Sequence, residues 1–213
     1  MSSKVEIAIV DYGMGNLRSV EKAFAEVGFP AVVTSNPSDI SDSEAVVLPG
    51  VGAFGDAMKE LKARGILDIV RQRAAEARDG GRPFLGICLG MQVLVESGEE
   101  SGGCEGLAVI EGTCPRLQRK QLKVPHMGWN SLVFKQQANP LYEGVGASPY
   151  VYFVHSYAVA PSSPSVVAAV SDYGGEVVAS LRAKNLFATQ FHPEKSQDVG
   201  LRMLRNFGGV IKA

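Results

Sequence analysis

The chain has 213 residues, of which 46% are hydrophobic and 20% charged, a composition that is typical of globular proteins and excludes the disordered and fibrous classes. At roughly 150 residues per domain, residues 1–213 are expected to form a single domain. The 21 Lys and Arg residues balance 22 Asp and Glu residues to a net charge of -1, which disfavours nucleic acid and membrane surfaces as partners.

The first half of the sequence alternates short β-branched runs with segments of helical period, which indicates α/β organisation with a mostly parallel sheet. In chain order the pattern predicts a strand over 5–10, a helix that is capped by Asn16 and stopped by Gly28, strands over 31–33 and 45–48, a helical stretch over 56–79 that breaks near Gly65, and a strand over 84–87.

The second half predicts mostly antiparallel strands, over 107–110, 132–134, 150–154, 166–170, 176–180 and 186–190. Intervening segments such as 161–165 are rich in turn residues and too short for crossover helices. These strands are therefore expected to extend or flank the parallel sheet. A helix over 197–207 is expected to close the chain.

The cysteines and the hydrophobic runs bear on the cellular compartment. Cys88, Cys104 and Cys114 are odd in number and irregular in spacing, which predicts neither a disulfide framework nor a zinc site. Every apolar run is interrupted before the roughly 18 residues that a bilayer requires, and the N-terminal residues lack the features of an export signal. We therefore expect a cytoplasmic protein with free thiols and with no metal or other cofactor.

A candidate nucleophile lies where a predicted strand runs directly into a helix, in the segment Gly86-Ile87-Cys88-Leu89-Gly90. Glycines on both sides of a cysteine suit the sharp turn of a nucleophile elbow, which would hold Cys88 at a helix N-terminus where the dipole favours a thiolate. A small buried structural cysteine is the competing interpretation of these five residues.

A base and an acid follow in Gln190-Phe191-His192-Pro193-Glu194, at the end of another predicted strand. A thiol hydrolase needs a base that takes and returns the thiol proton, together with a carboxylate that fixes the imidazole tautomer. His192 and Glu194 supply both groups. Each residue alone fits an ordinary structural role, and only their occurrence together with the elbow favours catalysis.

The glycine-rich loop Gly50-Val51-Gly52-Ala53-Phe54-Gly55 matches the dinucleotide fingerprint G-x-G-x-x-G. We reject a dinucleotide site because Pro49 interrupts the turn into the helix and because the loop follows the third strand instead of the first. A better role is to place a backbone N-H group beside that of Leu89, where an oxyanion would form. An ordinary glycine turn is the alternative.

At this point the sequence resembles a known family. Residues 86–92 (GICLGMQ) and 190–194 (QFHPE) look like the signatures of class I, triad-type glutamine amidotransferases. Residues 10–17 (VDYGMGNL), 49–55, 124–130 (VPHMGWN) and 155–157 (HSY) further resemble the glutaminase subunits of imidazole glycerol phosphate synthases. The similarity runs in collinear order over almost the whole chain.

The resemblance implies a fold, an activity and a set of site residues. The fold would be a flavodoxin-like three-layer sandwich with a central mixed, mostly parallel sheet and an antiparallel extension. Cys88 would attack the side-chain amide of L-glutamine, His192 would shuttle protons, and Glu194 would orient His192, giving glutamate and ammonia through a thioester. The family pattern adds an oxyanion site at Gly50, Val51, Gly52 and Leu89, and glutamine-binding residues at Gln92, Glu96, His155, Ser156 and Tyr157.

The resemblance also implies a partner. In this family a barrel cyclase receives the ammonia and uses it to make imidazole glycerol phosphate in histidine biosynthesis, so we expect a heterodimer. The residues expected to face the cyclase are Met127, Trp129, Asn130, Tyr152 and Lys195.

Two alternatives stay open at this stage. The nearer is a class I glutaminase of another synthase, such as anthranilate or pyridoxal phosphate synthase, for which residues 124–130 would have no reason to match. The farther is a non-catalytic flavodoxin-like binding module. Spacing assigns no chemical role to Gly13, Gly15 or Asn16, beyond shaping a loop beside the site, and none to Cys104 or Cys114.

Overall fold

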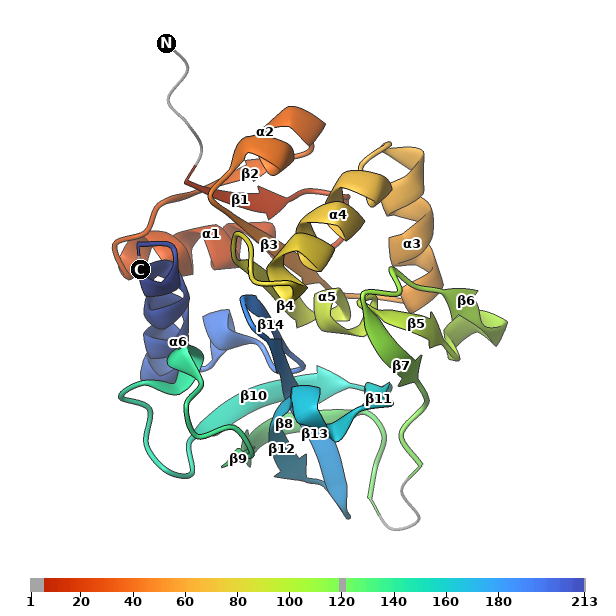
Figure 1. The fold of residues 1–213 in the computed structure, drawn as a ribbon. Helices are drawn as coiled ribbons and strands as arrows, with labels where there is room; N and C mark the ends of the chain where they lie inside the picture. The colour runs from red at the N-terminus through yellow and green to blue at the C-terminus, as the bar shows by residue number, and fades with distance from the viewer. Residues whose placement is uncertain (1–5, 119–121, 213) are drawn as a thin grey trace.

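The computed structural model describes residues 6–118 and 122–212 and is built around one eight-stranded sheet (Figure 1). In order across the sheet the strands are β2 (Ala31–Thr34), β1 (Ile7–Val10), β3 (Ala45–Gly50), β4 (Phe84–Cys88), β14 (Leu186–Thr189), β13 (Glu176–Ala183), β12 (Val167–Asp172) and β9 (Val133–Phe134). The strands from β2 to β14 pair in parallel, and β13, β12 and β9 continue the sheet in antiparallel fashion. The expected mixed sheet with an antiparallel extension is confirmed.

Helices cover both faces of this sheet and make the three layers of a flavodoxin-like sandwich (Figure 1). On one face, α1 and α6 bury Phe24, Met203 and Phe207 against Ile9 and Val47. On the other face lie α2, α3, α4 and the short α5. The bounds are α1 (Leu17–Glu26), α2 (Pro37–Asp42), α3 (Phe54–Ala63), α4 (Leu67–Arg78), α5 (Leu89–Gln92) and α6 (Gln197–Val210).

Two smaller sheets flank the large one. An antiparallel pair consists of β8 and β10, and a four-stranded sheet has the order β11-β7-β5-β6. Their bounds are β8 (His126–Ser131), β10 (Tyr150–His155), β11 (Ala160–Pro161), β7 (Ile110–Cys114), β5 (Val95–Gly98) and β6 (Cys104–Glu105). The predicted antiparallel strands of the second half therefore both extend and flank the sheet, as expected.

Several predicted boundaries differ from the observed ones for identifiable reasons. The strand expected over 107–110 is wrong, because Ala108 has a φ of 52° and breaks the extended backbone, so that β7 begins only at Ile110. The helical stretch over 56–79 begins at Phe54 and splits at Gly65, whose φ is 68°. Asn16 lies at the cap of α1 but its side chain makes no capping hydrogen bond. Val5 lies outside the described residues.

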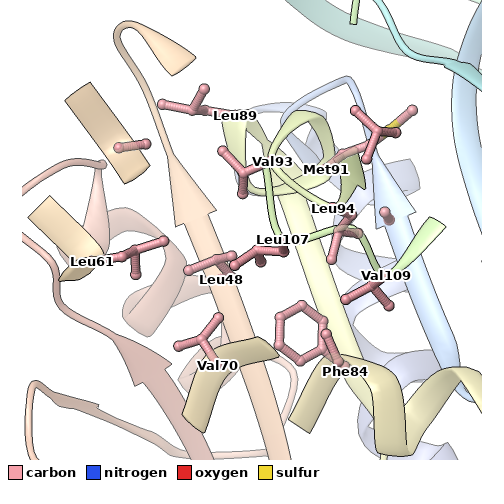
Figure 2. Close-up of a cluster of buried hydrophobic side chains, with 14 of the residues drawn as sticks. Leu48, Leu61, Val70, Phe84, Leu89, Met91, Val93, Leu94, Leu107 and Val109 are labelled. Atoms are coloured by element: carbon pink, nitrogen blue, oxygen red, sulfur yellow. The ribbon is translucent and has the colours of Figure 1, made fainter. Parts of the chain in front are cut away.

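A buried cluster fixes the segment that follows β4. Figure 2 shows Leu89, Met91 and Val93 packed in one hydrophobic cluster with Leu48 from β3 and Phe84 from β4. Each of these side chains is at most 1% exposed. Burial of such residues is the main stabilising contribution at this point of the fold, and it holds the turn at Cys88 in one position relative to the sheet.

Candidate functional site

Cys88 lies at the junction of β4 and α5 in a strained backbone conformation. Its φ is 55°, a region that a residue with a Cβ rarely adopts. A Cβ at Gly90 would overlap the carbonyl oxygen of Leu48, and one at Gly86 would lie 2.7 Å from the carbonyl oxygen of Gly90. The glycine requirement predicted for a nucleophile elbow is therefore confirmed.

The helix that follows Cys88 is short. α5 has only four residues, because the apolar run 93–95 turns into the core and continues as β5. A single turn carries little of the macrodipole of a long helix. A cationic side chain near Cys88 would stabilise a thiolate more than this single turn does.

The titratable side chain that interacts with Cys88 is His192, which the chain positions through a 3-10 turn at Pro193–Lys195. Nδ1 of His192 lies 2.8 Å from Oε1 of Glu194, and both side chains are almost fully enclosed. The backbone N-H of His192 donates to the carbonyl of Tyr152 on β10 at 3.0 Å. Ser196 donates its hydroxyl to the carbonyl of His192 at 2.6 Å. The hydrogen bonds of the main chain at His192 and the contact of its ring with Glu194 therefore both fix the position of the imidazole.

The charge state of His192 follows from these neighbours. Burial by itself lowers the pKa of the ring, but Cys88 and Glu194 oppose it and raise the pKa to about 9. His192 is therefore an imidazolium at neutral pH when Cys88 is a thiolate. Among the described residues, Nε2 of His192 is buried without a hydrogen-bond partner, and so is Oε2 of Glu194. Nε2 of His192 therefore remains available for exchange of a proton with a reacting group.

The glycine-rich loop lies at the carboxyl end of β3, where Gly50 pairs with Cys88 in the parallel register. Gly52 has a φ of 106°, and a Cβ there would lie 2.6 Å from the methyl carbon of Met14. A Cβ at Gly50 would overlap the hydroxyl of Tyr12, a buried group with no hydrogen-bond partner among the described residues. Glycine is therefore required at position 52 by its positive φ and at position 50 by the lack of room for a Cβ.

The two backbone donors expected for an oxyanion lie on this loop and on the elbow. Leu89 is the first residue of α5, and an N-H in the first turn of a helix has no acceptor within the helix. Val51, 40% exposed, lies between the two glycines and lines the same cavity as Cys88. A Cβ at Gly15 would lie 3.5 Å from the carbonyl of Pro49, so the loop after β1 does lie against the oxyanion loop, as suggested for Gly15.

One cavity of about 280 Å³ brings most of the predicted glutamine-binding residues to the thiol. Gln92 donates from Nε2 to the carbonyl of Tyr157 at 2.9 Å and to Oε1 of Gln190 at 3.1 Å. Nε2 of Gln190 in turn lies 3.7 Å from Sγ of Cys88. The cavity is lined by Val51, Gly52, Cys88, Leu89, Gln92, Glu100, Pro125, Val154, His155, Ser156 and Tyr157.

Glu96 is the predicted glutamine-binding residue that the structure places elsewhere. It does not line the cavity, and its carboxylate accepts a hydrogen bond from the N-H of Gly112 at 2.9 Å. Glu100, which sequence reasoning missed, lines the cavity instead and accepts from the N-H of Phe54 at 2.7 Å. The two partners are 46 positions apart in sequence, so no local sequence signal predicts the contact.

The residues expected to face a partner lie on and around the pair of strands β8 and β10. Met127 and Trp129 are 65% and 46% exposed on the outer face of β8. The ring of Tyr152, opposite Trp129 in the register, contacts it edge-on at 6.1 Å. Lys195 is exposed beside the triad. Asn130 differs from the others, because its Nδ2 donates inward to the carbonyl of Asp172.

The remaining cysteines lie apart from this chemistry. Cys114 is buried, and burial raises the pKa of its thiol far above its ordinary value. Cys104 is half-exposed and directs its thiol to the carbonyl of Glu105. Within residues 6–118 and 122–212, no group of three or more His, Cys, Asp or Glu side chains could hold a metal ion. In the same part of the chain, no helix is long and apolar enough to cross a membrane.

Comparisons with known proteins add to this geometry. The family model described as glutamine amidotransferase class-I matches residues 8–209. The chain is 50% identical over 210 residues to imidazole glycerol phosphate synthase subunit HisH of Syntrophotalea carbinolica. This alignment covers 96% of this chain and 100% of that protein. The chain is also 49% identical over 200 residues to the protein of the same name from Aquifex aeolicus, covering 93% of this chain and 94% of that protein.

Solved structures are similar in fold at much lower identity. The crystal structure of a glutamine amidotransferase has a TM-score of 0.70 and 21% identity, covering 95% of this chain and 98% of the other. PurLQS from Thermotoga maritima has a TM-score of 0.71 and 17% identity, covering 97% and 99%. At these identities the similarity bears on the fold alone.

Proposed function

The chain belongs to the class-I glutamine amidotransferase family, and from that premise we propose how its residues release ammonia from glutamine. It acts as the glutamine amidotransferase subunit of imidazole glycerol phosphate synthase, in keeping with relatives that are about half identical over nearly the whole chain. The cavity beside Cys88 would hold the glutamine side chain. Residues 1–213 would form one amidotransferase domain, and the free cysteines fit a reducing compartment such as the cytoplasm.

The reaction would pass through two balanced steps at Cys88. The thiolate sulfur attacks the amide carbon of glutamine, and the tetrahedral oxyanion is held by the N-H groups of Leu89 and Val51. The C-N bond then breaks as His192 gives its proton to the leaving nitrogen, which departs as ammonia. Water attacks the thioester carbon, His192 takes its proton, and the C-S bond breaks to release glutamate and restore the thiolate. Glu194 keeps the Nδ1 proton in place throughout.

The single observation that carries this proposal is that a strained cysteine and the glycine-rich loop line one small cavity, while the cysteine interacts with an enclosed imidazole-carboxylate pair. His192 Nε2 has no hydrogen-bond partner among the described residues, and Cys88 acts to raise the pKa of His192, which supports proton transfer between this thiol and this base. A binding module would have no need of a nucleophile at a φ of 55°.

The ammonia would be used by a cyclase partner bound as a heterodimer. The outer face of β8, with Met127 and Trp129 exposed, supports this docking site because large apolar side chains rimmed by polar groups are typical of interfaces. Tyr152 and Lys195 would lie at the same interface. Asn130 would contribute from the inner face of the strand.

Labelling with a diazoketone analogue of glutamine tests the proposed chemistry. In the complex with the cyclase, mass spectrometry of the digested protein is expected to find the analogue on Cys88 alone, at about one per chain. Cys104 and Cys114 serve as internal controls, since one is half-exposed and the other buried outside the cavity. Labelling that is absent, or that favours Cys104, would contradict the assignment of Cys88 as the nucleophile.

A further inference from the structure

The sequence contains three histidines, and only His192 has a part in the chemistry proposed above. The other two, His126 on β8 and His155 on β10, are both buried. Nδ1 of His126 lies 3.0 Å from Nε2 of His155. The ring of His126 also stacks against Phe153 and Tyr173, at centroid distances of 4.5 and 4.0 Å. A ring enclosed in this way has a defined orientation, and its two nitrogens have defined roles.

The carbonyl of Tyr157 sets the direction of the hydrogen bonds. A carbonyl oxygen only accepts, so Nδ1 of His155, at 2.9 Å from it, carries a proton. Burial lowers the pKa of His155 to about 4, although the hydrogen bond to the Tyr157 carbonyl opposes this. The ring is therefore neutral, its Nε2 is an acceptor, and Nδ1 of His126 is the donor to it.

Asn130 continues this arrangement outward along β8. Its Nδ2 donates to the carbonyl of Asp172 at 2.8 Å, and its Oδ1 accepts from the N-H of Ser131 at 2.8 Å, which fixes the orientation of the amide. The same Nδ2 lies 3.2 Å from Nε2 of His126. The three hydrogen bonds that link Asn130, His126, His155 and the carbonyl of Tyr157 therefore all run in one direction, from the amide on β8 to that carbonyl.

The inner end of this chain of hydrogen bonds reaches the reacting thiol. The carbonyl of Tyr157 also accepts from Nε2 of Gln92, which bonds in turn to Gln190 beside Cys88. His155 and Gln92 line the cavity directly. A change in the position of His155 would therefore move the acceptor that holds Gln92 against the substrate.

We propose that His126 is a positioning residue for the glutamine pocket, which donates from Nδ1 to keep His155 in its neutral Nδ1-H form and so places the Tyr157 carbonyl and Gln92. This inference rests on the proposed function, since it takes glutamine as the occupant of the cavity. His126 touches neither the thiol nor the substrate. Its effect belongs to glutamine binding and not to the chemical steps.

The location of Asn130 gives this arrangement a link to the docking surface. Side chains alternate along β8, so His126 and Asn130 face inward while Met127 and Trp129 face outward. A partner bound to the outer face contacts the same short strand that carries the donors. Docking of the cyclase is thus expected to act on glutamine affinity through this strand.

The functional test compares two substitutions in the full chain bound to its cyclase partner. His126→Phe keeps an aromatic ring for stacking on Phe153 and removes both nitrogens. Tyr173→Phe is the matched control, because it alters the other stacking ring and removes no member of the chain of hydrogen bonds. His126→Phe is expected to raise the KM for glutamine about tenfold, as loss of one buried hydrogen bond would, with kcat within about twofold. Tyr173→Phe should leave KM unchanged, and both variants should keep ammonia-dependent synthesis.

Nitrogen-15 NMR of the histidine rings gives a readout that does not depend on activity. In the unmodified protein at pH 7, His126 and His155 are expected to be neutral with the proton on Nδ1. In His126→Phe, the Nε2 resonance of His155 should leave its hydrogen-bonded position. If that variant does not fold, Asn130→Leu replaces it, with an expected rise in KM of about threefold.

A charged ring or an Nε2-H form at His126 or His155 would overturn the inference, and so would an unchanged KM in a folded variant. A complex that hydrolyses no glutamine at all would contradict the proposed function instead. In that case the nitrogen-15 NMR spectra of His126 and His155 would still test the direction of the hydrogen bonds between them.

Discussion

Nδ1 of His192 lies 2.8 Å from Oε1 of Glu194, with only 2% and 1% of the two side chains exposed. The residues are two apart in sequence, and the 3-10 turn between them directs the carboxylate to the ring. With Nδ1 occupied in this way, Nε2 is left for the thiol of Cys88. The base and its orienting group are therefore separate residues whose contributions can be measured separately.

The first prediction separates these two roles. His192→Ala is expected to lower glutamine-dependent turnover by roughly 10³ or more, because proton transfer to the leaving nitrogen is lost. Glu194→Gln is expected to keep more activity, since an imidazole without its carboxylate still accepts a proton. Steady-state glutaminase assays of the complex measure both, with ammonia-dependent synthesis as the control. Wild-type rates in both variants would show that the segment 190–194 takes no part in the mechanism.

The second prediction concerns pH and stability. The pKa of His192 is raised to about 9 in the folded protein, whereas in an unfolded chain histidine titrates near 6.5. Between these values His192 holds a proton in the folded state that it lacks in the unfolded chain, so the stability that this side chain contributes is present below about pH 6.5 and is lost as pH rises through about 9. Urea unfolding should show a steeper loss of unfolding free energy over this window in the wild type than in Glu194→Gln. Equal slopes would contradict the raised pKa.

The third prediction tests the packing of the elbow. A Cβ at Gly90 would overlap the carbonyl of Leu48, a backbone atom that cannot move aside cheaply. Gly90→Ala is therefore expected to destabilise the protein by about 3 kcal/mol or more. Gly209→Ala is the control, because Gly209 lies in α6 with nothing near its Cβ position, and it should stabilise by about 0.5–1 kcal/mol. Equal unfolding midpoints for the two variants would show that the elbow is not tightly packed.

Much of this architecture could be predicted from local sequence. The alternation of apolar runs and helical segments indicates the parallel sheet because period and turn residues are local properties. The elbow could be recognised because its two glycines flank the nucleophile within five residues. The base His192 and the acid Glu194 could be proposed from their residue types after a predicted strand and then from the family resemblance, although the neighbouring Gln190 lies 102 positions from Cys88.

What escaped prediction depends on contacts that are distant in sequence or on unusual backbone angles. The run 107–109 has the composition of a strand, but Ala108 at a φ of 52° breaks the extended backbone. β8 is recognisable in the sequence as a motif and not as a strand, since Gly128 and polar side chains interrupt its apolar pattern. The inward orientation of Asn130 follows only from the pairing of β8 with β10.

The fourth prediction concerns control by the partner. The isolated protein is expected to hydrolyse glutamine very slowly and to accelerate when the cyclase and its nucleotide ligand bind, because the loop 50–52 can turn a peptide N-H toward the oxyanion at little cost. Gly52→Ala, which disfavours the positive φ at this position, should restrict the loop and lower the stimulated rate while sparing ammonia-dependent synthesis. Lys195→Glu should weaken association or blunt the stimulation. Glutaminase assays of the isolated protein, the complex and the ligand-bound complex decide it, and an isolated protein that already works at the stimulated rate would contradict gating.

The central claim is that Cys88 is the nucleophile that frees ammonia from glutamine, and Cys88→Ala in the assembled complex tests it most directly. Synthesis of imidazole glycerol phosphate is measured once with glutamine and once with added ammonia, which bypasses the thiol. The account predicts that glutamine-dependent synthesis falls by at least about 10³, while ammonia-dependent synthesis stays within about twofold of the unmodified complex. Equal loss of both activities in a complex that still assembles would make Cys88 structural and contradict the account.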